Sequence, residues 1–265
     1  MPELPEVETI RRQLTSSLIR AEILTVEVRA AKCFVGAPAS LTGETVTAIN
    51  RVGKYLYVGF ASGRGLAIHL KMTGRLVMDV DSYGSSPYTR VVLTLKDGRK
   101  LYYWDTRMFG YLRIVEDVQL AYELQKKEMG PEPWNITETE LLRRLQKTGR
   151  AIKEVLLDQK MLAGVGNIYA NDSLWEAGLR PNRKANSLKL SEVTQLLAAI
   201  ILVFERGLVT GGASDNSYVD ATGRKGRYQN EFRVYKGGIC KRCGRELIYG
   251  KVGGRGTWWC ESCQH

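Results

Sequence analysis

Four cysteines near the C-terminus constrain the fold of this chain more than any other feature. They form two Cys-x-x-Cys pairs, Cys240 with Cys243 and Cys260 with Cys263, and 16 residues separate the pairs. Two such pairs can place four thiolates around a tetrahedral Zn²⁺. Two disulfides or a redox pair are the alternative, but a reducing compartment and the lack of a βαβ context favour zinc. Because four sulfurs leave no open coordination position, we expect one structural zinc ion in a small β-hairpin domain.

The charge of the chain predicts a polyanionic partner. Its 265 residues include 39 Lys and Arg against 28 Asp and Glu, a formal net charge of +11. Nucleic acid is the first candidate, because each neutralised phosphate releases a counterion. An anionic membrane surface is the second, but the sequence has no amphipathic basic helix and no lipidation motif. The longest apolar run, Leu196 to Phe204, falls short of the ~20 residues that span a bilayer. We expect no membrane association.

The first half of the chain carries helix and strand signals in turn. Apolar residues recur at spacings of three and four, which predicts a helix at the start; they are Leu4, Val7, Ile10, Leu14 and Leu18. Short runs rich in β-formers follow at 23–28, 55–60, 65–70 and 75–80, and Asp97-Gly98 lies between two more. The first ~115 residues therefore predict one helix with a β-sandwich or barrel. Residues 3 to 12 are too charged for a signal peptide, so we expect a cytoplasmic protein.

Helical periodicity replaces the strand pattern after "GPEPW" at 130–134. Helices are expected within 138–147, 151–160 and 167–178, and from Ser191 to Arg206 with Gly207 as the stop. The following stretch, 211–227, is rich in Gly, Ser and Asp and predicts a mobile loop. We therefore predict an α+β multidomain fold. Its parts are an N-terminal β-sandwich domain at 1–130, a helical domain at 135–225 and a zinc finger at 231–265.

Three motifs together resemble one family. They are "MPELPEVET" at the N-terminus, "GVGNIYANDSLWEAGLRP" in the middle and Cys-x2-Cys-x16-Cys-x2-Cys at the end. In this order, and over essentially the whole chain, they are similar to bacterial formamidopyrimidine-DNA glycosylase. The resemblance implies a helix–two-turns–helix in the helical domain. It also implies an enzyme, expected to be a monomer, that flips oxidised purines such as 8-oxoguanine out of double-stranded DNA, excises them and cleaves the strand by β,δ-elimination.

The resemblance makes Pro2 the nucleophile after removal of Met1. A free α-amino group has a pKa of ~8, so part of it is neutral at physiological pH and can form a Schiff base with the sugar. The resemblance assigns proton transfer at the deoxyribose ring oxygen to Glu3, and support of the active-site helix to Glu6. On its own, Pro2 reads as a helix-starting proline and Glu6 as an ordinary first-turn acid.

Further residues are assigned to DNA by the same resemblance. The phosphate contacts are Lys54, which also assists base removal, and His69, Lys153, Asn167 and Arg255. The residues that fill the space left by the flipped base are Met72, Arg107 and Phe109. Their chemistry fits, since Phe can stack, Met can fill an irregular gap and Arg can bond the orphaned base. The alternatives are a surface lysine, a structural histidine, a helix cap at Asn167, a solvated Arg255, and core packing for Met72 and Phe109.

The chain departs from the family pattern at three places. Tyr88-Thr89-Arg90 stands where many members have a His-x-His, Asn171 replaces a common acid or Ser, and Ser214-Asp215-Asn216 in the lesion-capping loop is unusual. These departures leave the lesion preference open. The sister endonuclease VIII-like group, which removes oxidised pyrimidines, is the nearest alternative, although it usually begins Pro-Glu-Gly-Pro. A non-catalytic DNA-binding protein is the other, although such a protein needs neither Pro2 nor Glu3.

Overall fold

A computed structural model describes residues 1–215 and 217–265, which form two compact units. The first combines Met1–Lys127 with Leu208–Gln229, and the second combines Glu128–Gly207 with Asn230–His265. Asn216, in the predicted capping loop, lies outside the described residues. The three-domain division at 1–130, 135–225 and 231–265 stays a prediction.

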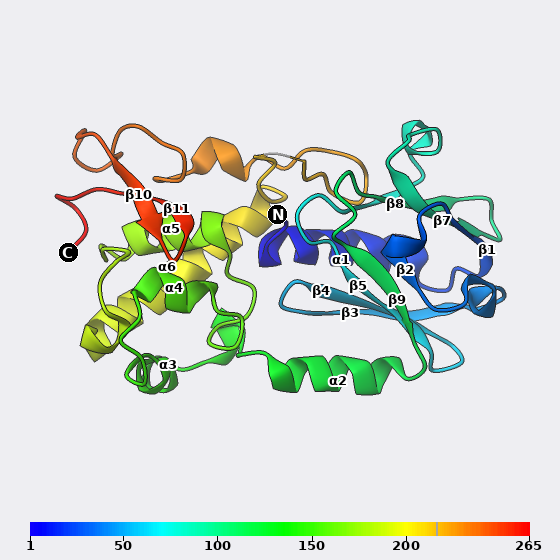
Figure 1. The fold of residues 1–265 in the computed structure, drawn as a ribbon, viewed down its shortest axis with the longest axis horizontal. Coiled ribbons are helices and arrows are strands. Elements are labelled where there is room, and N and C mark those ends of the chain that lie inside the picture. Colours follow the sequence, from blue (N-terminus) through cyan, green and yellow to red (C-terminus); the bar gives the residue numbers. More distant parts are fainter. Residues whose placement is uncertain (216) are drawn as a thin grey trace. The chain divides into compact units, whose positions relative to one another are not determined.

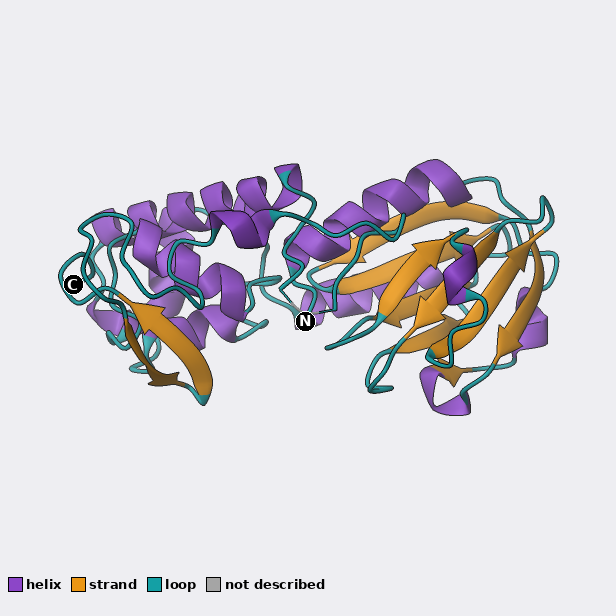
Figure 2. Cartoon of the chain, turned by 90° about the horizontal axis from the view of Figure 1, so that it is seen from above, coloured by secondary structure: helices purple, strands orange, loops and turns teal. Residues whose placement is uncertain are grey.

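The first unit combines two β-sheets with helix α1 (Leu4–Leu18) and most of helix α2 (Val118–Glu128) (Figures 1 and 2). The four-stranded sheet has the order β1 (Ile23–Val28), β7 (Thr89–Leu95), β8 (Lys100–Trp104) and β6 (Arg75–Met78). The five-stranded sheet has the order β2 (Phe34–Val35), β9 (Tyr111–Val115), β5 (Gly65–His69), β4 (Tyr55–Phe60) and β3 (Val46–Val52). Within these sheets only the β2–β9 pair is parallel. The predicted α+β fold with a β-sandwich is confirmed.

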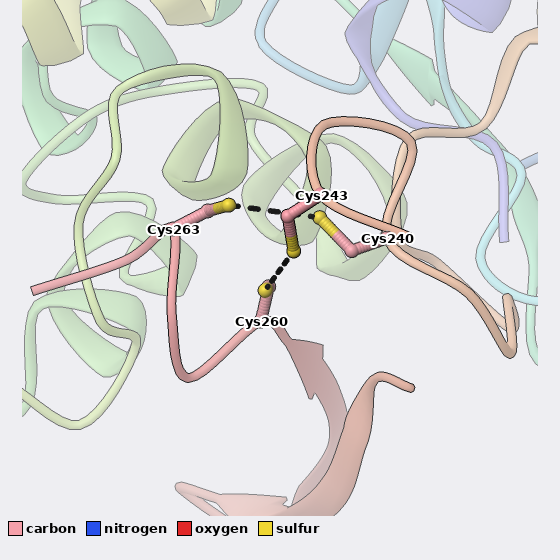
Figure 3. A group of neighbouring side chains, drawn as sticks. All are labelled: Cys240, Cys243, Cys260 and Cys263. Atoms are coloured by element: carbon pink, nitrogen blue, oxygen red, sulfur yellow. Dashed lines mark hydrogen bonds between the residues drawn. The ribbon is translucent and has the colours of Figure 1, made fainter. Parts of the chain in front are cut away.

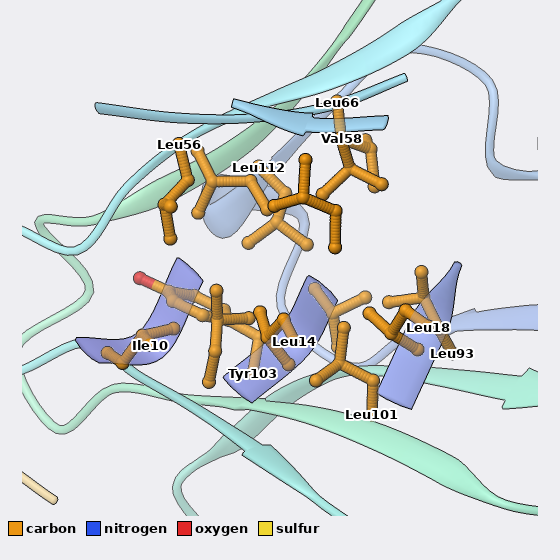
Figure 4. Packing of buried hydrophobic residues seen from close by; sticks show 14 of the residues in the cluster. Ile10, Leu14, Leu18, Leu56, Val58, Leu66, Leu93, Leu101, Tyr103 and Leu112 are labelled. Carbon is orange, nitrogen blue, oxygen red and sulfur yellow. The ribbon is translucent and has the colours of Figure 1, made fainter. Parts of the chain in front are cut away.

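Helix α1 (Leu4–Leu18) supplies the centre of this unit's core. As Figure 4 shows, Ile10, Leu14 and Leu18 point into a cluster that both sheets complete. The five-stranded sheet contributes Leu56, Val58, Leu66 and Leu112, and the four-stranded sheet contributes Leu93, Leu101 and Tyr103. Because each fully buried Leu or Ile stabilises the fold by roughly 1.5–3 kcal/mol, this packing fixes the helix that begins directly after Pro2 and Glu3.

The second unit contains the predicted helices and the hairpin. Its elements are α3 (Glu138–Leu145), α4 (Ile152–Leu157), α5 (Asn167–Glu176), most of α6 (Leu190–Val209), and the strands β10 (Ile248–Val252) and β11 (Arg255–Trp259). Thr137 caps α3 by accepting the Glu140 N–H at 3.2 Å. Across 1–215 and 217–265, no helix has the length and apolar character of a membrane span.

The prediction that Gly207 ends the last long helix is wrong. Helix α6 continues to Val209, and Gly207 faces the ring of Tyr169. A Cβ atom at this position would lie 2.4 Å from the Tyr169 Oη. The glycine therefore permits close packing inside the second unit and does not terminate the helix. Strands β2, β3 and β9 and helix α2 (Val118–Glu128) were not predicted from the sequence.

Part of the predicted mobile loop is fixed to the first unit. The Gln13 side chain donates to Asp220 Oδ2 at 2.9 Å and accepts the Ala221 N–H at 2.8 Å. The Ala221 carbonyl accepts the Met78 N–H at 2.7 Å. These contacts hold residues 220 and 221 against α1 and the end of β6. The mobility of the segment stays a prediction.

Candidate active site and metal centre

The N-terminal motif forms the start of α1. The Glu3 N–H donates to Glu6 Oε2 at 2.7 Å, which satisfies one of the free amides at the helix end. The other oxygen of Glu6 accepts the Ala213 N–H, also at 2.7 Å. Pro2, Glu3 and Glu6 are buried, whereas Met1 is 40% exposed. Glu6 thus joins the first residues of the chain to a segment 207 residues later.

A second carboxylate, Glu8, links α1 to the turn that carries Lys54. It lies between three guanidinium groups, with Arg11 and Arg12 on its own helix and Arg51 on β3. Arg51 donates to Glu8 Oε2 at 3.0 Å and to the Gly53 carbonyl at 2.9 Å. Lys54 follows directly and is buried. Glu8 was not singled out in the sequence, where it looked like one more first-turn acid.

His69, at the end of β5, is a buried neutral histidine in the free protein. Burial lowers its pKa to about 3, and the charges of Lys71 and Lys54 act in the same direction. The Nδ1 atom accepts the Lys71 N–H at 2.9 Å, so the proton of the neutral ring is on Nε2. The ring packs edge-on against Tyr55, with 4.4 Å between centroids. The histidine can therefore donate one hydrogen bond from Nε2 without carrying charge.

The three predicted void-filling residues lie on two loops of the first unit. Met72 follows β5 and is 38% exposed, and Phe109 follows β8 and is 50% exposed. Core packing therefore does not describe either side chain. The Arg107 guanidinium lies over the Phe109 ring, 4.7 Å from its centroid. The buried Asp105, which the sequence reading missed, bonds to both loops.

Lys153, Asn167 and Arg255 meet at the hairpin of the second unit. The hairpin turns at Gly253-Gly254, both with positive φ, and Arg255 is the first, exposed residue of β11. The Gly256 carbonyl accepts from Lys153 Nζ at 2.8 Å and from Asn167 Nδ2 at 3.1 Å. Lys153 is fully buried and also donates to Thr257 Oγ1 at 2.8 Å. In the free protein Lys153 and Asn167 therefore hold the hairpin beside Arg255.

The four cysteine thiols lie close enough to share one metal ion. Their Sγ atoms are within 4.8 Å of one another, with Cys243 and Cys260 at 3.5 Å and Cys240 and Cys263 at 3.9 Å (Figure 3). A tetrahedral Zn²⁺ with 2.3 Å bonds needs sulfurs ~3.8 Å apart, so the arrangement fits that ion. All four are free cysteines, as a metal site requires. Zinc itself remains the expected occupant on chemical grounds.

Helix α5 supports this cysteine cluster directly. The Trp175 indole N–H donates to the Cys240 sulfur at 3.3 Å, and the Arg242 guanidinium stacks 4.0 Å from the centre of the Trp175 ring. Burial alone would raise the pKa of Cys240, but the hydrogen bond from Trp175 and backbone N–H donors lower it to about 6. The thiolate, which is the metal-binding form, is thereby favoured.

Asn171 gives a physical reason for one departure from the family pattern. Its Nδ2 donates to the Asn167 carbonyl at 2.7 Å, and its Oδ1 accepts the Trp258 N–H at 3.0 Å. Only a side chain that both donates and accepts can make this link between α5 and β11. An ionised acid could accept from Trp258 but could not donate to Asn167.

The predicted site residues thus form two groups. The first unit holds Pro2, Glu3, Glu6, Lys54, His69, Met72, Arg107 and Phe109, and the second holds Lys153, Asn167, Arg255 and the four cysteines. The residues that sequence reasoning missed are the buried acids Glu8 and Asp105, together with Trp175. An acid followed by Thr-Arg and ending at a glycine is a loop signal that could have indicated Asp105.

Comparison with protein families gives two matches that together cover most of the chain. Residues 1–112 match the formamidopyrimidine-DNA glycosylase N-terminal domain, and residues 129–218 match the formamidopyrimidine-DNA glycosylase H2TH domain. A formamidopyrimidine-DNA glycosylase of Desulfitobacterium hafniense (strain DSM 10664 / DCB-2) is 39% identical over the full length of both chains. One from Latilactobacillus sakei subsp. sakei (strain 23K) is 37% identical, over all of this chain and 98% of its own length.

Solved structures with the same fold contain DNA. A variant of the Lactococcus lactis enzyme bound to DNA with a Fapy-dG lesion has a TM-score of 0.91 and 34% identity, and the match covers 99% of each chain. A complex of the Lactococcus lactis enzyme with DNA that contains an abasic site matches equally well, with a TM-score of 0.91.

Proposed function

Because the chain belongs to the formamidopyrimidine-DNA glycosylase family, we propose that it removes oxidised purines from double-stranded DNA and then cleaves the abasic strand. The expected substrates are 8-oxoguanine and formamidopyrimidines. The observation that carries this proposal is the start of α1, where Pro2 and Glu3 are fixed by Glu6 and the buried face of the helix. The similarity to DNA-bound relatives over the whole chain supports the same substrate class.

The proposed nucleophile is the nitrogen of Pro2, exposed when Met1 is removed. A secondary amine with a pKa near ~8 is partly unprotonated at neutral pH. Its lone pair attacks C1′ as the glycosidic bond breaks and the base leaves, and opening of the sugar ring then gives an iminium ion. The iminium withdraws electrons from C2′, so a C2′ proton is lost and the 3′ phosphate leaves. A second elimination releases the 5′ phosphate, and water frees the proline.

Glu3 is the proposed partner in proton transfer at the ring oxygen. It is buried at the helix N-terminus next to Pro2, so no long side-chain movement is needed to bring a carboxyl group to the sugar. Glu6 would act indirectly, because its two oxygens are already used by the N–H groups of Glu3 and Ala213. This supports the role first assigned to Glu6, which is to hold the active-site helix.

Residues of both units are proposed to contact the DNA. In the first unit, Lys54 and His69 would bind phosphate near the lesion, with His69 as a neutral Nε2 donor. Met72, Arg107 and Phe109 would fill the vacated stack, for which their exposure on loops is favourable. In the second unit, Arg255 would bind phosphate, whereas the buried Lys153 is placed to orient the hairpin that carries Arg255.

Zinc would hold the hairpin in this arrangement and take no part in the reaction. The four thiolates of Cys240, Cys243, Cys260 and Cys263 would saturate its coordination, which leaves no position for water or substrate. Chelation should therefore weaken DNA binding through Arg255 without changing the amine of Pro2.

Covalent trapping tests the mechanism. Intact mass should show a mature N-terminus at Pro2, and borohydride should trap the protein on a duplex with 8-oxoguanine opposite cytosine. Pro2→Gly should reduce trapping, and an N-terminally blocked protein should give none. Persistent strand cleavage by the blocked protein would contradict the proposal.

A panel of lesions tests the substrate. Faster excision of 8-oxoguanine than of thymine glycol is the expected result. The reverse order would place the chain with the sister group that removes oxidised pyrimidines. DNA binding without excision or trapping on either duplex would indicate a non-catalytic DNA-binding protein.

A further inference from the structure

Asp105 is a fully buried carboxylate between the two loops that carry Met72 and Phe109. It follows β8 directly, and both of its oxygens are saturated by hydrogen-bond donors. These donors come from three places, which are the loop after β5, the loop after β8, and β8 itself. A carboxylate buried this completely is stable only when such donors surround it.

The Oδ1 atom connects the two loops to each other. It accepts a short hydrogen bond from the Thr73 hydroxyl, directly after Met72, and the Arg107 N–H at 3.0 Å. The same Arg107 N–H lies 3.3 Å from the Thr73 oxygen. Thr73, Arg107 and Asp105 Oδ1 therefore form one three-centre contact. Arg107 is part of it, and Met72 directly precedes Thr73 in the chain.

The Oδ2 atom fixes the far end of the second loop. It accepts the Gly110 N–H at 3.0 Å and the Tyr103 hydroxyl at 3.1 Å. Gly110 is packed so closely that an added Cβ would lie 2.2 Å from the Tyr103 Oη and 2.8 Å from the His69 carbonyl. Arg107 and Phe109 thus stand on a short loop whose two ends are bound to one carboxylate.

The backbone of Asp105 is also held, and by residues at which this chain departs from the family pattern. The Asp105 N–H donates to the Tyr88 carbonyl at 3.0 Å, and Arg90 Nε donates to the Asp105 carbonyl at 2.7 Å. These hydrogen bonds fix the Asp105 backbone beside the four-stranded sheet, and the carboxylate contacts both loops from that position.

We propose that Asp105 is a positioning residue that sets the spacing between Met72 on one loop and Arg107 with Phe109 on the other. This inference rests on the proposed function, because it assumes that these three side chains replace the flipped base. To fill the gap left by one flipped base, Met72 and Phe109, which occupy the space, and Arg107, which bonds the orphaned base, must enter the base stack together. A carboxylate shared by both loops meets that requirement, and Asn cannot replace it, because its Nδ2 would face the backbone N–H of Arg107 or of Gly110, which can only donate.

The test compares Asp105→Asn with Asp97→Asn, which changes an exposed acid at the other end of β8. Strand cleavage is measured on a duplex with 8-oxoguanine opposite cytosine and on a single-stranded oligonucleotide with an abasic site. Single-stranded DNA has no base stack to fill. Asp105→Asn should lower kcat/KM on the duplex by roughly ten- to hundredfold, the scale of a ~1 Å misplacement, and leave single-stranded cleavage within about twofold. Asp97→Asn should change neither.

A second measurement is selectivity for the base opposite the lesion. Because Arg107 would bond that base, Asp105→Asn should also reduce the preference for cytosine over adenine, which loss of folded protein alone would leave unchanged. If Asp105→Asn does not fold, Thr73→Val, which removes one donor at constant shape, should show the same duplex-only defect in weaker form. Equal losses on both substrates, or none, would overturn the inference. An unmodified protein inactive on both substrates would instead refute the proposed function.

Discussion

Replacing Glu8 with Gln should destabilise the first unit by about 2 kcal/mol. Burial alone would raise the pKa of Glu8, but hydrogen bonds from Arg11, Arg51 and Arg12 lower it from 4.5 to about 2. A pKa difference of this size corresponds to ~3.4 kcal/mol as an upper limit. Arg12 is 60% exposed and its contribution is screened by water, so we reduce the figure to about 2 kcal/mol. Gln keeps the shape but removes the carboxylate charge that pairs with the buried Arg51.

The sign of the pH dependence follows from the lowered pKa. The stabilisation is complete above pH 4.5, where the unfolded carboxylate is ionised, and is lost as the pH falls from 4.5 toward 2. The difference between the unmodified protein and Glu8→Gln should therefore shrink below pH 4.5. Amide hydrogen exchange in α1 is the suitable assay, because it reports this unit even if acid releases metal from the other.

Glu22→Gln is the matched control. Glu22 pairs with Lys96 at 2.9 Å, but the two side chains are 38% and 66% exposed, and such pairs contribute less than ~1 kcal/mol. If the two variants lose equal stability, or if the loss in Glu8→Gln does not change with pH, the reasoning about Glu8 is refuted.

Three further predictions concern single residues. Gly110→Ala should lower stability by roughly 1–3 kcal/mol in urea unfolding, because the new methyl would meet the buried Tyr103 hydroxyl at 2.2 Å. Trp175→Phe removes the hydrogen bond to Cys240 and should speed transfer of the bound metal ion to a chromogenic chelator about tenfold or more; an unchanged rate would contradict the contact. Burial lowers the pKa of His69 to about 3, so its ring resonances should not shift between pH 5 and 8 in the free protein, and stability should fall as the pH drops from 6.5 toward 3.

Local patterns predicted the elements whose physics is local. The three-and-four spacing of apolar residues identified α1, and alternating β-formers with Asp97-Gly98 identified the β7–β8 hairpin. The two-residue β2 has no pattern of its own and exists only by pairing with β9. Gly207 was misread because the sequence shows a glycine near a helix end but not the Tyr169 ring that occupies the space beside it.

The residues of the candidate site likewise fall into those that a local motif indicates and those that it does not. Its motifs marked Pro2, Glu3 and the cysteines, whose chemistry is visible in their order along the chain. The roles of Glu8 and Asp105 depend on partners distant in sequence, such as Thr73, which lies 32 residues before Asp105. No periodicity encodes such a pairing, so these two acids looked like ordinary charged residues until the fold brought their partners together.

Because the first unit is made of two separate stretches of the chain, it can be completed only late in protein synthesis. The first unit needs Leu208–Gln229, whose Ala213 N–H completes the bonding of Glu6. A nascent chain still attached to the ribosome at residue 200 therefore has the start of α1 but not the segment whose Ala213 N–H bonds to Glu6. Synthesis of the N-terminal motif and completion of its hydrogen bonds are therefore separated in time, because Glu6 gains the Ala213 N–H only after residue 213 has been added.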